Sequence, residues 1–322
     1  MPDAIDQWLV GDVRITRIAE MEMGGLPPSA LFVGLTHDRV LATDWLVPDY
    51  AGPDGSLRLS NHCFVIESDG KKIVVDTCVG NDKQRTAPNF DHQNSPFLAR
   101  LSAAGFPPES IDFVLCTHMH VDHVGWNTRW DGLRWAPTFP SARYLFGRTE
   151  WAHFREESIR QGDIESDVAA SMDAEQVVAD SIRPVIDAGL ADFVESDHRI
   201  TRDIALFSTP GHTPGHVSVL VESEGCRAII GGDVIHHPIQ IADRTICATV
   251  DTDRRQAQKT RSDLLDRLAG TDALLLGTHF PAPSGGLVTR NHEGWKFAPY
   301  CGEVPNRRDG AGIPTAPSAP LN

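Results

Sequence analysis

The chain has 322 residues, enough for one large domain or two ordinary ones with a substantial core. Its 29 Lys and Arg against 44 Asp and Glu give a formal net charge of −15, which argues against proteins that bind nucleic acid or anionic membranes through basic patches. Hydrophobic residues make up 41% and charged residues 23%, a balance that excludes a wholly disordered chain.

The six cysteines are scattered, and no two of them form a C-x-x-C pair. This spacing argues against a zinc ribbon and against a redox dithiol, so we expect free thiols in a reducing compartment. The first ten residues are acidic where a signal peptide would be basic. No stretch approaches the ~18 apolar residues of a membrane span. The sequence therefore predicts a soluble cytoplasmic protein with no membrane partner.

Residues 1–60 are predicted to form an N-terminal extension made of a strand and a loop. Val13, Ile15 and Ile18 lie in a roughly alternating apolar run, as expected of a strand with one buried face. The run Met23–Pro28 contains two glycines and two prolines and predicts a break in regular structure. The extension is a candidate contact surface for a second subunit, so a homodimer is a candidate assembly.

The main domain is expected to span residues 61–300 and to open with a hairpin. Two apolar runs, 63–66 and 73–75, flank an Asp69-Gly70 turn. Residues 301–322 are rich in Pro, Gly and Ala and are predicted to form a flexible C-terminal tail. Between the hairpin and the tail, apolar periodicity predicts helices at 96–104, 147–190 (mostly helical) and 254–268, and strands at 113–116, 205–208, 217–221, 227–230 and 273–276.

Two of these buried strands end in the same dipeptide. The strand at 113–116 leads into Thr117-His118, and the strand at 273–276 leads through one glycine into Thr278-His279. This repetition predicts two similar half-domains that face one shared site. Strands separated by helices further predict packed sheets with helices outside, an α/β architecture.

A histidine-rich loop follows the first of these strands. In an extended chain His118 and His120 project to the same side, because side chains alternate with a period of two. A turn after Val121 can then bring Asp122 and His123 to a second position. Imidazole and carboxylate groups suit zinc and similar divalent ions, whose bonds of ~2.0–2.2 Å require closely converging ligands.

The pattern H-x-H-x-D-H resembles the signature of the metallo-β-lactamase-fold hydrolases, in particular their lactonase and organophosphate-hydrolase-like branch. Three further motifs of that family follow in order, at Thr209–His216, Ile230–Asp233 and Gly277–His279. The resemblance implies that 61–300 is a catalytic domain with a four-layer αββα sandwich. It places the metal site at one edge, between the two sheets.

The resemblance also implies a set of metal ligands. A first ion would be held by His118, His120 and His212, and a second by Asp122, His123 and His279. Asp233 matches the carboxylate that bridges the two ions. His216 resembles a histidine of the second motif that is structural and not a ligand.

The family implies two divalent ions, with zinc expected and Mn, Fe or Co left open. A hydroxide bridging the ions would attack a neutral carboxylic ester or lactone, with phosphotriester hydrolysis as a candidate side activity. Asp122 is a candidate catalytic residue that passes a proton to the leaving oxygen. The expected partner is therefore a neutral, partly apolar small molecule and not a nucleic acid.

One position departs from the lactonase pattern. Acyl-homoserine-lactone lactonases commonly carry a Tyr three residues after the bridging Asp, and this chain has His236 there. His236 is a candidate catalytic donor to an oxyanion. Orienting Asp233 is an equally weighted alternative. His237 is expected to be structural or exposed.

Aromatic residues follow the metal motif, at Trp126, Trp130, Trp135 and Phe139. Such side chains are usually part of a core, but here one wall of an apolar substrate pocket is an alternative.

Two other activities on the same scaffold stay open. One is an iron-dependent enzyme resembling persulfide dioxygenases, and the other is a thioester hydrolase resembling glyoxalase II. A nuclease of the tRNA-maturation type is disfavoured by the charge of −15.

Overall fold

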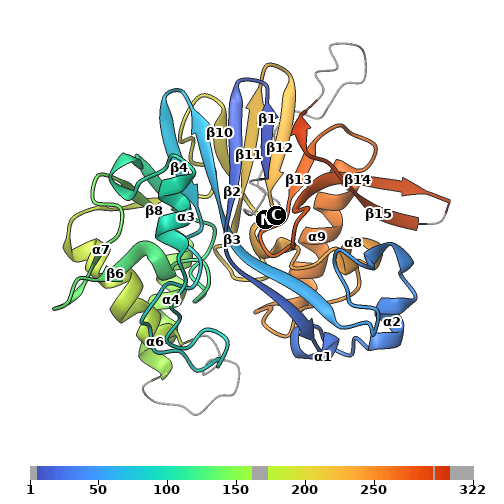
Figure 1. Cartoon of the computed structure of the whole chain (residues 1–322), viewed down its shortest axis with the longest axis horizontal. Coiled ribbons are helices and arrows are strands. Elements are labelled where there is room, and N and C mark those ends of the chain that lie inside the picture. The colour runs from blue at the N-terminus through green and yellow to red at the C-terminus, as the bar shows by residue number, and fades with distance from the viewer. Residues whose placement is uncertain (1–5, 162–172, 293, 305–322) are drawn as a thin grey trace.

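The computed structural model describes residues 6–161, 173–292 and 294–304. Two large sheets lie face to face at the centre of the molecule, and helices cover the outer face of each sheet (Figure 1). Helices α3, α4, α6 and α7 lie on one side, and α8 and α9 lie on the other. This is the expected four-layer αββα sandwich.

The first sheet has eight strands and the second has six, with a separate two-stranded sheet beside the first. In spatial order the eight are β16 (Gly302–Glu303), β1 (Gln7–Val10), β2 (Val13–Leu26), β3 (Leu57–Ser68), β4 (Lys71–Val75), β5 (Phe113–Cys116), β8 (Arg143–Gly147) and β9 (Ala191–Val194). The six are β10 (Ile204–Ser208), β11 (Val217–Ser223), β12 (Cys226–Ile230), β13 (Leu274–Leu276), β14 (Gly285–Asn291) and β15 (Gly294–Pro299), and the two-stranded sheet is β6 (Thr128–Trp130) with β7 (Trp135–Pro137).

Most helical segments are short, and only α4 and α9 exceed three turns. Helix α9 coincides with the helix predicted at 254–268. Its first turn is capped by Asp253, whose side chain accepts the Gln256 N–H. The segments are α1 (Pro28–Leu31), α2 (His37–Leu41), η1 (Asp44–Leu46), α3 (Phe97–Ala103), η2 (Pro108–Ser110), η3 (Gly125–Asn127), α4 (Arg148–Gln161), α6 (Ala174–Val177), the π-helical η4 (Val178–Ile182), α7 (Arg183–Asp187), η5 (Gly232–Val234), α8 (Ile239–Ala242) and α9 (Arg254–Leu268). Part of the stretch predicted as helical, 162–172, lies outside the described residues.

The core follows from the period of two along the strands. On β3, Phe64 and Ile66 pack between the sheets, whereas Cys63 and Val65 pack under the helices of the first sheet. On β13 the flanking Leu274 and Leu276 face the other sheet, and Leu275 faces the helices on its own side. At these central strands both faces of the sheet are buried, which explains why the strands are continuous apolar runs.

The hairpin of β3 and β4 forms as predicted, but β2 is longer than expected. Asp69 and Gly70 both have positive φ, as a type I′ turn requires. In β2 the strand continues through Met23 to Leu26 and pairs with β3 along its whole length. An irregularity in register between Met23 and Leu26 accommodates the two glycines, so the strand continues into the run predicted as a break and ends at Leu26.

Residues 6–60 are built into the same fold. Strands β1 and β2 belong to the eight-stranded sheet, and the expected boundary at residue 60 falls inside β3. The following segment packs on residues 234–251 of the same chain, where Phe32 forms a bridge with Ala248 and Thr249 N–H donates to Leu31 O. Contact with a second subunit stays a prediction. Of the predicted tail, residues from 305 onward lie outside the described part of the chain.

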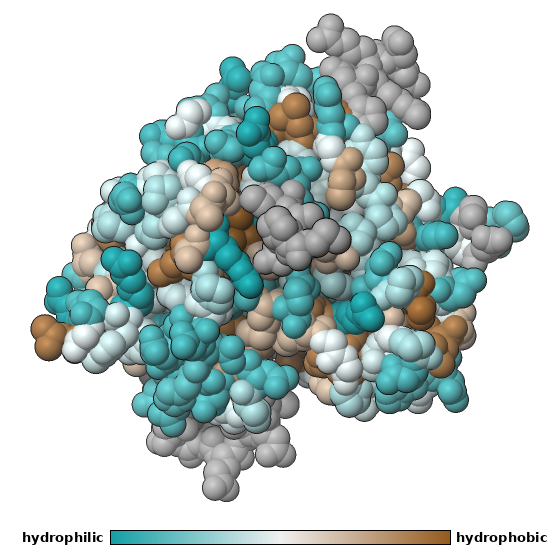
Figure 2. All heavy atoms as spheres, in the orientation of Figure 1, coloured by the Kyte–Doolittle hydropathy of each residue, from teal (hydrophilic) through white to brown (hydrophobic). Residues whose placement is uncertain are grey.

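The visible face of the molecule is mostly hydrophilic, with hydrophobic residues in small separate patches (Figure 2). In the described ranges, no helix combines the length and the apolar character needed to cross a bilayer.

Strand direction brings the chemically interesting residues together. β4, β5 and β8 are parallel neighbours, and so are β12 and β13. β10 runs in the same direction as β12 because each pairs antiparallel with β11. The carboxyl ends of these strands therefore lie at a common edge, and Asp76, His118, His212, Asp233 and His279 all follow such an end.

A buried lysine lies away from that edge. Lys83 is fully buried, its Nζ donates to Thr128 Oγ1 at 2.8 Å, and it lies 3.8 Å from the centre of the Trp135 ring. Lys83 Nζ also donates to Asp180 Oδ1 at 3.4 Å, but the Asp180 carboxylate is paired through both oxygens with Arg85 at shorter distances. Burial therefore dominates and lowers the pKa of Lys83 to about 7, although Asp180 opposes the shift.

This pKa predicts a specific dependence of stability on pH. An unfolded Lys titrates near pKa ~10.4, so above pH 7 the unfolded chain binds one more proton than the native chain, and stability rises with pH. The slope contributed by Lys83 approaches about 1.4 kcal/mol per pH unit. Urea unfolding between pH 7 and pH 8.5 should show this rise for the wild type and for Lys71→Met, an exposed control. Lys83→Met should lack it, and parallel curves for all three proteins would contradict the assignment.

Candidate metal centre

The loop after β5 turns as the motif predicted. His123 N–H donates to His120 O, which closes the turn and directs His118 and His120 to one side and Asp122 and His123 to another. Backbone hydrogen bonds hold the loop against residues 77–78, from Thr77 N–H to His123 O and from Gly125 N–H to Cys78 O. The ligand candidates are thus fixed to the segment that follows β4.

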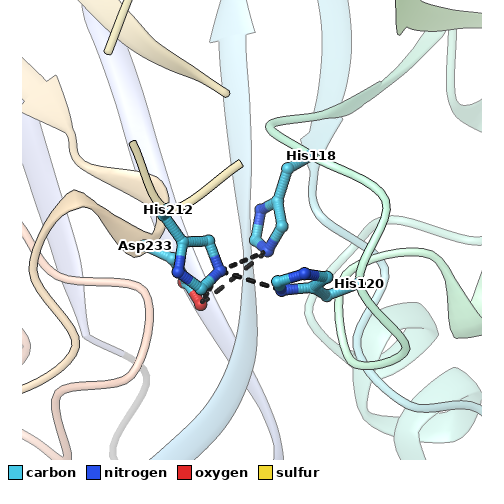
Figure 3. Close-up of side chains that lie close together, drawn as sticks. All are labelled: His118, His120, His212 and Asp233. Carbon is cyan, nitrogen blue, oxygen red and sulfur yellow. Dashed lines mark hydrogen bonds and ion pairs between the residues drawn. The ribbon is translucent and has the colours of Figure 1, made fainter. Parts of the chain in front are cut away.

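The first cluster contains His118, His120, His212 and Asp233 (Figure 3). His118 and His120 approach from one side and His212 with Asp233 from the other. His212 Nε2 lies 3.2 Å from His118 Nε2 and 2.8 Å from His120 Nδ1, and 3.4 Å from Asp233 Oδ2. All four residues are buried.

The second cluster contains Asp122, His123 and His279. The Nε2 atoms of the two histidines are 3.2 Å apart, and the Asp122 oxygens lie 3.6 Å from His123 Nε2 and 3.5 Å from His279 Nε2. The Asp122 side chain is the most exposed of the seven predicted ligands, at 14%. Solvent therefore reaches the two clusters from this side.

Asp233 lies between the clusters and divides its two oxygens between them. Oδ1 is 3.3 Å from His123 Nε2 and 3.1 Å from His279 Nε2, whereas Oδ2 faces His118 and His212. Oδ1 is buried and has no hydrogen-bond partner. The structure thus brings together all seven residues that the sequence predicted as ligands, in the two predicted groups.

The outward nitrogens of four imidazoles are anchored to the protein. Nδ1 of each lies 2.9–3.2 Å from an oxygen that can accept its proton. A neutral ring anchored in this way presents the lone pair of Nε2 inward. The four pairs are His118 with Thr117 Oγ1, His123 with Asp76, His212 with Asp251, and His279 with the Ser60 carbonyl.

Electrostatics favour deprotonated imidazoles in the first cluster. Burial, followed by neighbouring histidines, lowers the pKa of His118 and His120 well below the usual range, and burial does the same at His212. Burial would also lower the pKa of His123, but Asp233, Asp76 and Asp122 together raise it well above normal. The second cluster therefore attracts positive charge.

These observations test whether the donor set fits divalent ions. Four ligands at 2.0–2.2 Å from one ion in a tetrahedral site lie about 3.3–3.6 Å from one another. The separations within both clusters are close to this range. Inward lone pairs, an unpartnered carboxylate oxygen and nitrogen–nitrogen distances near 3 Å all fit cations, and the residues are those preferred by zinc.

Asp76 and Asp251 were not predicted from the sequence. Asp76 is buried and accepts Thr117 N–H at 2.8 Å and His123 Nδ1–H at 2.9 Å, which secures the loop and one ligand at once. Its position directly after β4, beside β5, is a signal that sequence reasoning could have used. Asp251 accepts His212 Nδ1–H and Ala248 N–H from a loop with no recognisable motif.

His216 has the structural role expected of it. Its Nε2 accepts Asp233 N–H at 2.9 Å, so its Nδ1–H donates to Thr209 Oγ1 at 2.8 Å. The relay continues from Thr209 to Ser218 Oγ and from Ser218 to Gly231 O. Burial lowers the pKa of His216 to about 4, so the ring is neutral, as this relay requires.

His236 lies beside both clusters. Its Nε2 is 3.2 Å from Asp233 Oδ2, and its ring contacts those of His212 and His279. The ring is 2% exposed, and neither nitrogen has a hydrogen-bond partner in the described part of the chain. His237 is structural, as expected, because its Nε2–H donates to Tyr50 O and its Nδ1 accepts Ile239 N–H.

The aromatic residues after the motif do not surround the clusters. Trp126 stacks on Phe97 in the core and donates its indole N–H to Glu20 at 2.6 Å, and Phe139 is fully buried in the same core. Trp130 is half exposed on the separate two-stranded sheet. The rings nearest the site belong instead to Phe154, next to His120, and Phe32, next to His236.

Comparison with known proteins agrees with this geometry. The metallo-beta-lactamase superfamily model matches residues 57–296. An N-acyl homoserine lactonase from Bacillus cereus is 25% identical over 186 residues, covering 53% of this chain and 62% of that protein. One from Bacillus thuringiensis is 23% identical over 190 residues, covering 55% and 64%. The match thus spans less than two-thirds of the length of these curated relatives.

Solved structures show the same fold over more of the chain. The hydrolase AbOPH, of the beta lactamase superfamily, has a TM-score of 0.74 at 22% identity, covering 92% of this chain and 97% of the other. AidC, a dizinc quorum-quenching lactonase in complex with N-hexnoyl-L-homoserine, has the same TM-score and coverage at 19% identity. With a family match over more than half of its length and all the ligand positions in place, the chain belongs to the metallo-beta-lactamase superfamily.

Proposed function

We propose that this protein is a metal-dependent hydrolase with two divalent ions and that it cleaves a neutral carboxylic ester or lactone. The observation that carries the proposal is the carboxylate of Asp233, whose two oxygens face two separate clusters of ligands. A single-ion enzyme, such as the iron-dependent alternative, has no need for both clusters.

The first ion would be bound by His118, His120 and His212, the second by Asp122, His123 and His279, with Asp233 shared between them. Zinc suits this set of imidazole and carboxylate ligands, and Mn, Fe and Co accept the same donors. When bound, such a pair of ions lowers the pKa of water and polarises a carbonyl oxygen.

The residues of this chain supply orientation and proton transfer. Asp122 lies at the solvent-accessible side and its carboxylate is held near His123 and His279. We assign to it the transfer of a proton to the leaving oxygen. His236 has two free nitrogens beside Asp233, and we assign to it a hydrogen bond to the oxygen that gains negative charge in the transition state.

The substrate class is inferred from the charges and rings at the site. The side chains gathered in the two clusters are histidines and aspartates. The rings of Phe154 and Phe32 lie against His120 and His236, so the surroundings of the histidine cluster are partly apolar. The curated relatives are named as lactonases of N-acyl homoserine, a neutral substrate with an apolar chain. These features favour a lactone or ester, with phosphotriesters as a candidate side activity.

A substrate panel tests the proposed reaction. Protein loaded with Zn, Mn or Co should hydrolyse p-nitrophenyl esters, γ- and δ-lactones or acyl-homoserine lactones, with weaker activity on paraoxon-like triesters. His118→Ala combined with His120→Ala should lose metal from the first cluster and lose turnover, whereas the exposed His37→Ala should retain both. Activity on glutathione thioesters alone would replace the ester assignment, and oxygen consumption with one bound iron would replace hydrolysis altogether.

Removing the carboxylate behind His123 should weaken metal binding. Asp76→Asn keeps the size of the side chain but leaves one of its three donors without an acceptor. We expect a 10–100-fold loss of metal affinity, the range typical when such an outer partner of a ligand is replaced. Competition with a chromophoric chelator measures this loss. Asp131→Asn, at an exposed turn, is the matched control, and equal affinities for the two variants would show that Asp76 does not tune the ligand.

The assigned role of His236 predicts a contrast between two substitutions. His236→Phe removes the hydrogen-bond donor while retaining a ring, so kcat should fall by about 10²–10³-fold, as for other lost oxyanion donors. His236→Tyr restores an O–H donor and should recover part of that loss. Metal content, measured in parallel, should stay at the wild-type value in both. A variant pair with equal kcat would indicate that His236 only orients Asp233.

A further inference from the structure

A buried glutamate joins the two loops that carry the first cluster. Glu150 lies in the first turn of α4 and is only 1% exposed, which is unusual for a residue type that is almost never fully buried. The sequence around it has no metal motif, and none of the roles described so far involves it. Its contacts therefore need a separate explanation.

The carboxylate of Glu150 accepts hydrogen bonds from both loops. Oε1 accepts Met119 N–H at 3.1 Å, and Met119 stands between His118 and His120. Oε2 accepts Thr213 Oγ1–H at 2.7 Å and Gly215 N–H at 3.1 Å, directly after His212. His118 and His120 approach the site from the side opposite to His212 (Figure 3). The Glu150 side chain links the loops that carry them.

The backbone around Glu150 also fits closely against the second loop. A Cβ atom added to Gly215 would lie 2.2 Å from Glu150 N and 2.5 Å from Glu150 Cα, which no side chain could occupy. The loop therefore rests directly on the first turn of α4. The distance between the two loops depends on this contact and on the three hydrogen bonds of the carboxylate.

An acceptor-only group is required at this point. Two N–H groups and one O–H group converge on the two oxygens, and a carboxylate accepts all three. The amide of a glutamine keeps one acceptor and would point its NH₂ at the donors on one side. A buried donor left without its acceptor is costly, so the loops would move apart.

We propose that Glu150 is a positioning residue that fixes the separation of the His118–His120 loop from the His212 loop and so tunes the affinity of the first cluster for its metal. The proposal rests on the metal centre proposed above. It assigns to α4 a function in the site, since the helix supplies no ligand.

Metal titration of the Co²⁺-loaded protein tests this role. We expect Glu150→Gln to bind the first-cluster ion 10–100-fold more weakly, to leave the second ion in place, and to change the d–d absorption of the remaining or partly filled first site. Glu109→Gln changes an exposed residue outside both loops. It is the matched control and should behave as wild type. A role in stability alone would lower the melting temperature without changing either the spectrum or the ratio of the two affinities.

A second variant approaches the same contact from the loop. Thr213→Val removes only the 2.7 Å hydrogen bond and should weaken the first ion by a smaller factor in the same direction. In the double variant the losses should be less than additive, because both substitutions break one linkage. If a folded Glu150→Gln protein has the affinity and spectrum of the wild type, the proposal is overturned. If Glu150→Gln does not fold, the same result in Thr213→Val overturns it. Failure of the wild-type protein to bind two ions would instead refute the metal centre itself.

Discussion

Imidazole nitrogens that face one another at about 3 Å inside a protein repel through their lone pairs unless positive charge lies between them. Around Asp233 imidazole nitrogens approach this closely three times, in His212 with His118, His212 with His120, and His123 with His279. Because Nδ1 of His118 and of His212 faces an outward acceptor and burial keeps both rings neutral, the two Nε2 atoms of that pair have no proton to share. The positions of the other residues around the site depend on this need for cations.

The sandwich supplies what that arrangement requires. Neither sheet alone contains a complete cluster, since His118 and His123 follow β5 in the first sheet, and His212, Asp233 and His279 follow strands of the second. Packing the sheets through a shared apolar core therefore also assembles the site. The outward partners of His123, His212 and His279 come from three different parts of the chain, so the geometry of the site depends on the packing of the whole domain.

The ligands could be predicted from the sequence because they occur in short local motifs after apolar strands. Asp251 and Glu150 could not, since each contacts the motifs only through long-range packing and has no pattern of its own. For Trp126 the sequence left a place in the core and a place in a pocket wall open, and the structure confirms the core. Although Trp126 follows His123 closely, the Gly125 backbone lies against Val79, and the indole is turned away toward Glu20. In β2 the glycines were read as a break, but pairing with β3 accommodates them as an irregularity in register.

The relay through His216 begins at the N–H of Asp233 and returns to the carbonyl of Gly231, two residues earlier. All hydrogen bonds of this relay run in the same direction, and together with the backbone between Gly231 and Asp233 they form a ring. The position of Asp233 is thus fixed by a hydrogen bond of its backbone and not by the ions it would bind. A carboxylate held in this way needs little reorganisation when the proposed ions bind.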